Sequence, residues 1–235
     1  MAPWGNPTDR VRCHVAHVEA PGGATVIRTD KWSVWTVEHL LAACTGAGLT
    51  DLRIVVDGSE LPALDGSAEV WFTRLSRAGC AYGPTYTRRS SSRGFRVVCG
   101  AGVAHWEPSD DAIAEVRDGE RSHRIRLWSP DTAPCFSRDV AWARTFVRRE
   151  DIARLRAAGR GRGATWSNTV FLGGGYRAKV RGEGEPLRHK LLDLVGDLTL
   201  IGQPWSGHVI VEGGSHELHH AVVRRALAGF DSSAL

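Results

Sequence analysis

The stretch Arg188–Asp197 places a histidine and two aspartates at intervals of four residues. If the stretch is helical, His189 and Asp193 lie one turn apart on the same face, and Asp197 continues that stripe. An imidazole and a carboxylate that point the same way offer two ligands to a zinc-like metal ion. The same spacing is common on salt-bridged surface helices, so this stretch alone is consistent with either interpretation.

A second stretch, residues 36–43, repeats the pattern far upstream and favours the metal interpretation. It contains Glu38 and His39, and His39 would add a second imidazole to His189 and Asp193. Two imidazoles and one carboxylate leave a fourth coordination position open for water, as in catalytic zinc sites. Glu38 is not needed as a ligand, so its carboxylate could take the proton from that water.

A third histidine, His216, is the candidate acid of this site. As a cation it could stabilise an oxyanion or give a proton to a leaving amine. Asp197 could hold His216 in its charged form and fix its orientation. A metal ion, a base, an acid and an orienting group together indicate a hydrolase that acts on an amide or an ester.

The elements that must carry these residues form two similar halves. Each half is predicted to contain a histidine-bearing helix, a strand, a turn and a second helix, at nearly the same spacing. Thr36 is the expected N-cap of the first helix. The predicted elements are a helix over 36–44, a strand over 51–57 and a helix over 67–78, and then a helix over 187–201, a strand over 208–211 and a helix over 216–228.

Between these halves, serine, glycine and arginine residues make 83–94 the predicted linker. The remaining predicted elements are strands over 95–99, 105–106, 112–116 and 123–128, a helix over 149–158 and a strand over 165–172. We therefore predict an α+β fold, a two-domain sandwich of similar halves, each a small sheet packed on paired helices. The predicted domains are residues 1–88 and 94–235, with the metal site between them.

The amino-acid composition limits which binding partners and which cellular compartment we expect. The net charge of +4 suits a phosphate-bearing small molecule as well as nucleic acid. The aromatic residues are not interleaved with the basic runs as a base-stacking platform would need, so we expect no nucleic-acid partner. The five cysteines are odd in number and scattered, which favours a reducing compartment over a disulfide framework. We expect a cytoplasmic protein without membrane insertion, because no apolar run could cross a bilayer or act as a signal peptide.

Several blocks of the sequence together resemble a known family. They are residues 36–43, 64–68, 143–146 and 188–197, and the sequence Gly-Ser-His that ends at His216. In order and approximate spacing they are similar to the zinc-dependent UDP-3-O-acyl-N-acetylglucosamine deacetylases of lipid A synthesis, from about Arg12 to Ala228. The resemblance implies two α+β domains with Zn²⁺ between them.

The resemblance also implies a role for each matching residue. It assigns zinc to His39, His189 and Asp193, the general base to Glu38, the acid to His216 and the acid's partner to Asp197. It further implies that the Thr145 hydroxyl helps to polarise the substrate carbonyl. Phe146 would lie against the sugar, and Lys190 would be a cation on the substrate side.

The chain departs from the family's pattern at three places. The first strands of the family and a Gly-rich, His-containing segment are not found, so the first sheet should be smaller or covered at its edge by a second copy of the chain. His219 and His220 stand where the family has amides. Residues 150–187 form an insert on the substrate side, and this region is rich in glycine and arginine where the family builds a passage for a fatty acyl chain.

These departures, with an arginine-biased composition that suits bacteria lacking lipid A, lead us to predict a soluble substrate. The predicted activity is zinc-dependent removal of an N-acyl group, with N-acetyl as the expected case, from an amino sugar. We expect this sugar to be linked to a nucleotide or a nucleoside and to belong to specialised metabolism such as antibiotic biosynthesis. The close alternative is the lipid A deacetylase itself. A non-catalytic descendant that binds a metal or a ligand is the third possibility, and the retention of Glu38 and of every ligand candidate argues against it.

Overall fold

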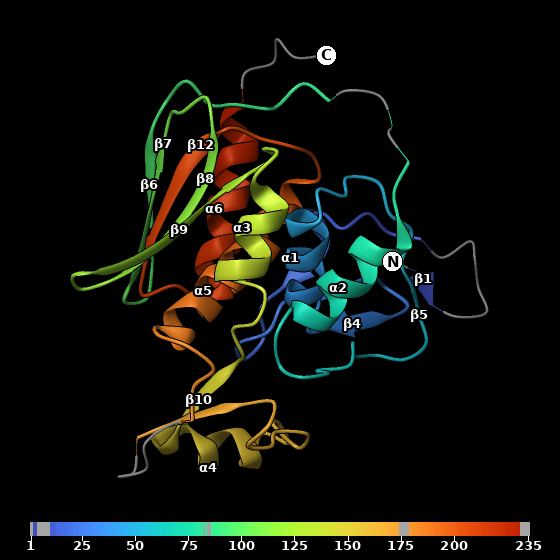
Figure 1. The fold of residues 1–235 in the computed structure, drawn as a ribbon, viewed down its shortest axis with the longest axis vertical. Coiled ribbons are helices and arrows are strands. Elements are labelled where there is room, and N and C mark those ends of the chain that lie inside the picture. Colours follow the sequence, from blue (N-terminus) through green and yellow to red (C-terminus); the bar gives the residue numbers. More distant parts are fainter. Residues whose placement is uncertain (1, 4–9, 82, 84–85, 174–178, 231–235) are drawn as a thin grey trace.

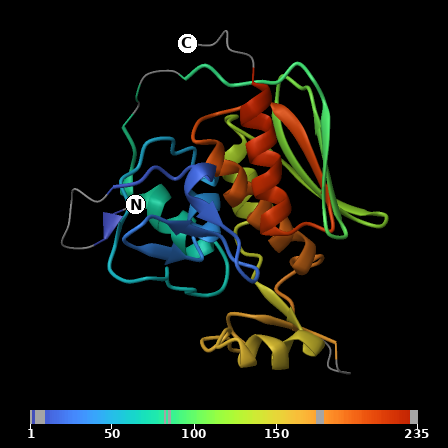
Figure 2. The ribbon, with the colours of Figure 1, turned by 180° about the vertical axis from the view of Figure 1, so that it is seen from behind.

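Helices lie at the centre of the molecule, with strands on either side of them (Figures 1 and 2). The helix α5 (Glu185–Leu198) contacts α1 (Glu38–Gly46), α6 (His216–Gly229) and the large sheet. The computed structural model describes residues 2–3, 10–81, 83, 86–173 and 179–230, so residues 84–85 of the predicted linker lie outside the described residues. The α+β class is confirmed as a mixed arrangement of several sheets and helices.

The large sheet contains five strands in the order β6-β7-β12-β8-β9. They are β6 (Phe95–Cys99), β7 (Gly102–Glu107), β8 (Ala112–Asp118), β9 (Arg121–Leu127) and β12 (Gly207–Glu212). The last strand in the sequence, β12, lies in the middle, parallel to β8 and antiparallel to β7. Side chains alternate between buried and exposed along much of β7, because α6 covers one face of this sheet and the other face meets solvent.

The helices that carry the candidate site residues form where the sequence predicts them. A 3-10 turn, η2 (Thr199–Ile201), continues α5, and α6 begins where the Ser215 hydroxyl accepts a hydrogen bond from the backbone N–H of Leu218. One helix, α3 (Thr132–Asp139), has no counterpart in the sequence prediction. It is short, and Pro134 interrupts its pattern, although a proline in the first turn costs the helix no hydrogen bond.

The N-terminal sheet is small and antiparallel, in the order β2-β3-β4. Its strands are β2 (Val18–Glu19), β3 (Val26–Arg28) and β4 (Ser33–Trp35), preceded by the 3-10 turn η1 (Val15–His17). The helix α2 (Glu69–Ala78) packs against α1, as the sequence predicts for the paired helices of this half. Covering of the sheet edge by a second copy of the chain stays a prediction.

Two local predictions in this part are wrong. Of the predicted strand 51–57, only β5 (Val55–Val56) is paired, in parallel with β1 (Ala2–Pro3). Val55 is 47% exposed, so this strand is not buried as predicted. An apolar run becomes a buried strand only where a neighbouring strand pairs with it, and β1 reaches just this end. Thr36 does not cap α1, since it adopts a φ of 61° and Val37 occupies the N-cap position.

The two halves share a hydrophobic core. One cluster of buried side chains includes Leu40 and Leu41 of α1 together with Leu191 and Leu194 of α5. The helices approach closely at Gly196, where a Cβ atom would lie 2.1 Å from the backbone oxygen of Glu38. Because the core is continuous, the division into two sandwich domains at 1–88 and 94–235 stays a prediction.

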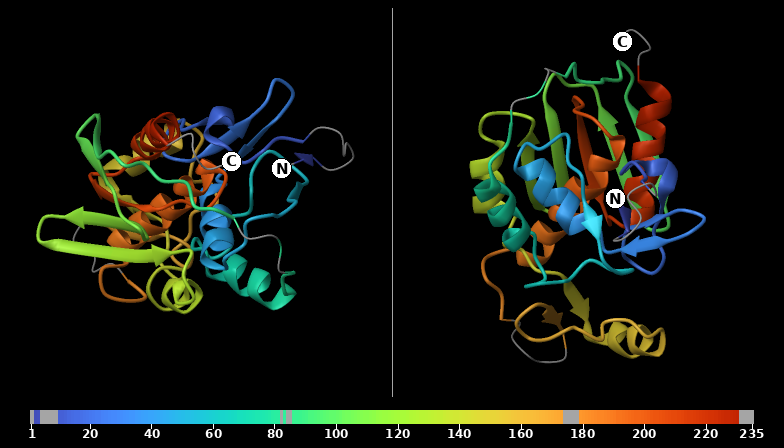
Figure 3. Two further views of the ribbon diagram at one scale, coloured as in Figure 1. Left: turned by 90° about the horizontal axis from the view of Figure 1, so that it is seen from above. Right: turned by 90° about the vertical axis from the view of Figure 1, so that its right-hand side faces the viewer.

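A small lobe extends from the body below the central helices (Figures 1 and 3). It consists of β10 (Phe146–Arg148), α4 (Arg149–Ala157) and β11 (Val170–Leu172), and the two strands pair in parallel. The helix agrees with the prediction, whereas only the last three residues of the predicted strand 165–172 are extended. Within the described residues, no helix is long and apolar enough to span a membrane.

Candidate metal and catalytic site

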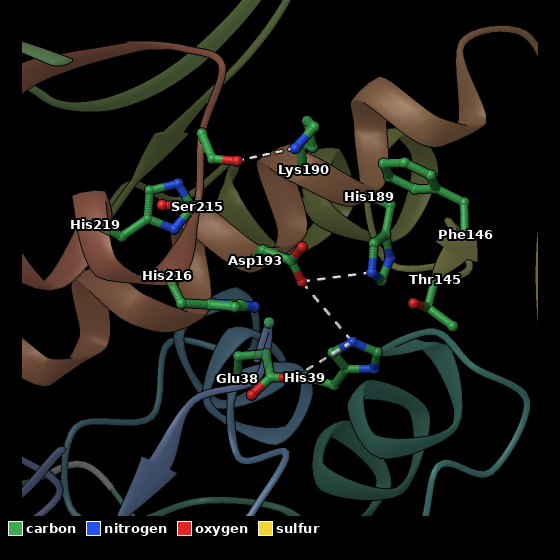
Figure 4. A pocket seen from close by; sticks show the side chains of 12 residues that line it. Glu38, His39, Thr145, Phe146, His189, Lys190, Asp193, Ser215, His216 and His219 are labelled. Carbon is green, nitrogen blue, oxygen red and sulfur yellow. Dashed lines mark hydrogen bonds and ion pairs between the residues drawn. The ribbon is translucent and has the colours of Figure 1, made fainter. Parts of the chain in front are cut away.

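The helices α1 and α5 bring the candidate metal ligands together (Figure 4). Nε2 of His189 lies 3.4 Å from Oδ1 of Asp193, and Nε2 of His39 lies 3.8 Å from the same oxygen. One ligand atom from each residue falls within 4.8 Å of the other two. Residues that are far apart in the sequence thus converge because α1 and α5 pack against each other.

The chemistry of this group fits a zinc ion. Oδ1 of Asp193 is buried and makes no hydrogen bond within the described part of the chain. Burial without a partner is costly for a carboxylate oxygen unless a bound group, such as a metal ion, interacts with it. Nδ1 of His189 lies 3.0 Å from the backbone oxygen of Ala143, so this ring keeps its proton on Nδ1 and directs Nε2 into the site. Burial and the neighbouring His189 lower the pKa of His39 to about 4, which leaves the neutral imidazole that binds metals.

Glu38 lies beside the ligand group and has the properties of a base. Its Oε1 is 4.0 Å from Nε2 of His39, and its Oε2 accepts a hydrogen bond from the backbone N–H of Thr25 at 3.0 Å. Burial raises the pKa of Glu38 to about 7, although the nearby His216 opposes that rise. A carboxylate with a pKa near neutrality can both take up and release a proton under ordinary conditions.

His216 and Asp197 form a buried ion pair on the other side of the site. Nδ1 of His216 donates to Oδ2 of Asp197 at 2.7 Å. Burial alone would lower the pKa of His216, but the Asp197 carboxylate outweighs it and raises that pKa to about 10. Burial likewise opposes ionisation of Asp197, and His216 nevertheless holds the pKa of that carboxyl well below its usual value. His216 is therefore a cation at neutral pH.

A cleft of ≈ 240 Å³ joins these groups to the predicted substrate residues. Nζ of Lys190 donates to the backbone oxygen of Gly214 at 2.9 Å and lies 5.7 Å from the ring centre of Phe146. The Phe146 ring meets His189 edge-on, with the ring centres 6.2 Å apart. The structure thus brings every predicted site residue except Asp197 to the cleft wall. The lining residues are Gly23, Glu38, His39, Thr145, Phe146, His189, Lys190, Asp193, Gly214, Ser215, His216 and His219.

A buried ion pair supports Thr145 and Phe146 from behind. The guanidinium of Arg144 donates from Nε to Oε1 of Glu185 at 2.8 Å, and the backbone N–H of Arg144 donates to the same oxygen at 3.1 Å. The backbone N–H of Thr145 continues this support by donating to the oxygen of Gly66 at 2.8 Å. Sequence reasoning misses this role of Arg144, because its partner lies far away along the chain.

Sequence reasoning also misses the residues that surround Asp197. The Thr25 hydroxyl donates to Oδ1 of Asp197 at 2.6 Å, Nδ1 of His219 lies 2.8 Å from Oδ2, and Nε2 of His220 lies 3.4 Å from Oδ1. Both additional histidines are buried rather than on a solvated helix face. The only signal in the sequence is the spacing of His216, His219 and His220, which turns all three toward one side of α6.

Comparisons with known proteins show the family of this chain. The sequence profile described as "LpxC: UDP-3-O-acyl N-acetylglycosamine deacetylase" matches residues 4–228. The UDP-3-O-acyl-N-acetylglucosamine deacetylase of Nostoc sp. is 33% identical over 232 residues, 91% of this chain and 78% of the relative. The proteins of the same name from Trichormus variabilis and Campylobacter curvus are each 32% identical, over 93% and 87% of this chain and 82% and 72% of the relatives. The chain therefore belongs to the LpxC family of UDP-3-O-acyl-N-acetylglucosamine deacetylases.

Proposed function

We propose that this chain is a zinc-dependent deacetylase that removes the N-acetyl group of a UDP-3-O-acyl-N-acetylglucosamine-type substrate. The observation that carries the proposal is the convergence of His39, His189 and Asp193 around a buried carboxylate oxygen that makes no hydrogen bond to any described residue. These residues would hold Zn²⁺. When bound, the ion would supply Lewis-acid activation of water and of the amide carbonyl.

The remaining roles in the hydrolysis belong to protein side chains. Glu38 would take a proton from the attacking water, whose oxygen forms a bond to the acetyl carbon. The Thr145 hydroxyl would donate to the carbonyl oxygen as negative charge develops there. His216, held as a cation by Asp197, would give its proton to the nitrogen as the C–N bond breaks, which releases acetate and the free amine.

Lys190 and Phe146 would position the sugar at one end of the cleft. The Lys190 ammonium lies over the Phe146 ring, so an apolar surface and a hydrogen-bond donor adjoin each other. Such a pair suits a sugar ring, which has an apolar face and a polar rim.

The acylated nucleotide sugar replaces the soluble amino sugar as the leading substrate. Relatives that carry the name UDP-3-O-acyl-N-acetylglucosamine deacetylase match most of this chain. The family profile spans residues 4–228, a range that includes all the residues that line the cleft. None of the comparisons bears on antibiotic biosynthesis, which stays a prediction from the sequence.

One feature keeps the soluble amino sugar as a second candidate. The helix α4 of the small lobe has no fully buried residue, and the loop after it carries Arg160 and Arg162 between glycines. Trp166 is 67% exposed and packs on Phe171 with ring centres 4.4 Å apart. A lobe with so little buried apolar surface offers a long acyl chain only limited contact.

Acetate release separates the two substrates. The zinc-loaded protein is supplied with UDP-3-O-acyl-N-acetylglucosamine, with UDP-N-acetylglucosamine, or with a nucleoside-linked N-acetyl amino sugar. We expect the acylated substrate to give the highest kcat/KM. Turnover of a non-acylated sugar, with the acylated one inert, would instead establish the second candidate.

A pair of variants distinguishes a catalyst from a non-catalytic binding protein. We expect Glu38→Gln to retain zinc but to lose about 10²–10⁴-fold in kcat, because it removes the base and leaves the ligands. Asp193→Ala should lose zinc as well as activity, because it removes a ligand. Metal analysis with acetate-release kinetics measures both effects, and full activity of Glu38→Gln would refute the mechanism.

A further inference from the structure

Asp197 holds two imidazoles at the cleft rather than one. Its Oδ2 accepts hydrogen bonds from Nδ1 of His216 at 2.7 Å and from Nδ1 of His219 at 2.8 Å. Its other carboxylate oxygen accepts from the hydroxyl of Thr25 at 2.6 Å. The proposed mechanism uses His216 only, so the second imidazole has no role in it.

The contact with Asp197 determines which nitrogen of His219 carries the proton. An ionised carboxylate can only accept hydrogen bonds, so a neutral His219 keeps its hydrogen on Nδ1 and has a lone pair on Nε2. Burial lowers the pKa of His219 despite the opposing effect of Asp197, and this favours the neutral form. Nε2 of His219 is therefore a hydrogen-bond acceptor.

This acceptor lacks a partner among the described residues. Nε2 of His219 is buried and makes no hydrogen bond, and the whole residue is only 2% exposed. His220, the next residue of the same helix, provides the contrast, because its Nε2 lies 3.0 Å from the Thr25 hydroxyl. Buried polar groups nearly always find a partner, so an orphaned atom at a cleft wall points to a ligand.

Lys190, a hydrogen-bond donor, lines the same cleft as His219 (Figure 4). Both groups flank Gly214. The Lys190 ammonium donates to the backbone oxygen of Gly214 at 2.9 Å, and a Cβ atom on Gly214 would lie 2.9 Å from Nε2 of His219. A side chain at Gly214 would therefore press directly on this imidazole. Lys190 has further N–H donors for a ligand at this wall.

We propose that His219 is a substrate-binding residue whose Nε2 accepts a hydrogen bond from a hydroxyl group of the sugar, while that hydroxyl's oxygen accepts one from Lys190. A hydroxyl fits both neighbours because it is a donor and an acceptor at once. The assignment rests on the proposed function, which makes the ligand an amino sugar. His219 thereby selects for a sugar that retains this hydroxyl.

Deoxy analogues test the assignment directly. UDP-3-O-acyl-N-acetylglucosamine and its 4-deoxy and 6-deoxy analogues are titrated calorimetrically into zinc-loaded Glu38→Gln protein, in which turnover is blocked. With His219 intact, we expect one deoxy analogue to bind about 10-fold or more weakly than the parent, because loss of the hydroxyl leaves the buried Nε2 of His219 without a hydrogen-bond donor. In the Glu38→Gln/His219→Leu protein, the parent and that analogue should bind with equal affinity.

His220→Leu is the matched control, because His220 is equally buried on α6 and also lies near Asp197, but its Nε2 is already paired. This variant should keep the discrimination between parent and analogue. Loss of discrimination in His220→Leu, equal binding of all the sugars with His219 intact, or an unchanged penalty in His219→Leu would overturn the assignment. If the protein with His219 intact binds none of these sugars, the proposed function itself fails and the assignment falls with it.

Discussion

At the scale of single residues, Asp197 acts through its charge as well as through its position. Burial alone would lower the pKa of His216, and the carboxylate 2.7 Å away raises that pKa to about 10. His216 is therefore protonated throughout the neutral range and loses its proton as the pH rises through about 10. His216, the proposed acid, should accordingly remain functional at moderately alkaline pH.

We expect Asp197→Asn to move the alkaline limb of the kcat/KM profile to lower pH. Once the negative charge is gone, burial dominates and the pKa of His216 falls below its ordinary value of 6.5, so little acid form remains at neutral pH. The profile is measured for both proteins at matched zinc content, with circular dichroism to check folding. An alkaline limb at the same pH in both would exclude His216 as the titrating acid.

At the scale of elements, the crossing of α1 and α5 sets the geometry of the site. Gly196 lies against the backbone of Glu38, so the residue proposed as the base touches the helix that carries His189 and Asp193. A side chain at this point would have to push the two helices apart, because backbone atoms cannot rotate out of the way. The ligand atoms of His39 would then move away from those on α5.

Gly196→Ala should therefore weaken zinc binding as well as the fold. Overpacking of this kind costs about 1–3 kcal/mol of stability. Gly46→Ala on α1 is the control, because its Cβ would lie 2.3 Å from the buried Phe136 ring, at a point outside the cleft lining. Both variants should lower Tm, but only Gly196→Ala should release zinc more readily to a chelator. Equal zinc affinity in the two variants would contradict this account.

The sequence predicts α1, α5 and α6 well because their runs of residues rich in leucine or alanine are local features of the chain. The candidate ligands lie on these helices, so their convergence follows once the helices pack together. Thr25 and His219 could not be predicted, because each is defined by contact with Asp197 rather than by a neighbour in the sequence. The strand around Val55 fails because only two of its residues find a pairing partner, which is a tertiary property, and the cap fails because Thr36 adopts a φ of 61°.

At the scale of the whole molecule, zinc removal should lower thermal stability. An ion that binds only the folded state stabilises it by about 4 kcal/mol at a free concentration 1,000-fold above its Kd. Calorimetric Tm values with and without a chelator measure this effect. Asp193→Ala should show no response to the chelator, and a wild-type Tm that is equally insensitive would argue against a metal bound by these residues.

The shared core has a further consequence for how a bound ion would act. The candidate ligands come from helices far apart in the sequence, so in the unfolded chain their encounter would require closing a very long loop, at an entropic cost. In the folded chain, packing of α1 on α5 has already closed that loop, and an ion would act there as a reversible cross-link between the two halves. Metal affinity would then measure how firmly the halves are joined. The first measurable effect of a substitution that weakens the contact between the halves should be a loss of bound zinc.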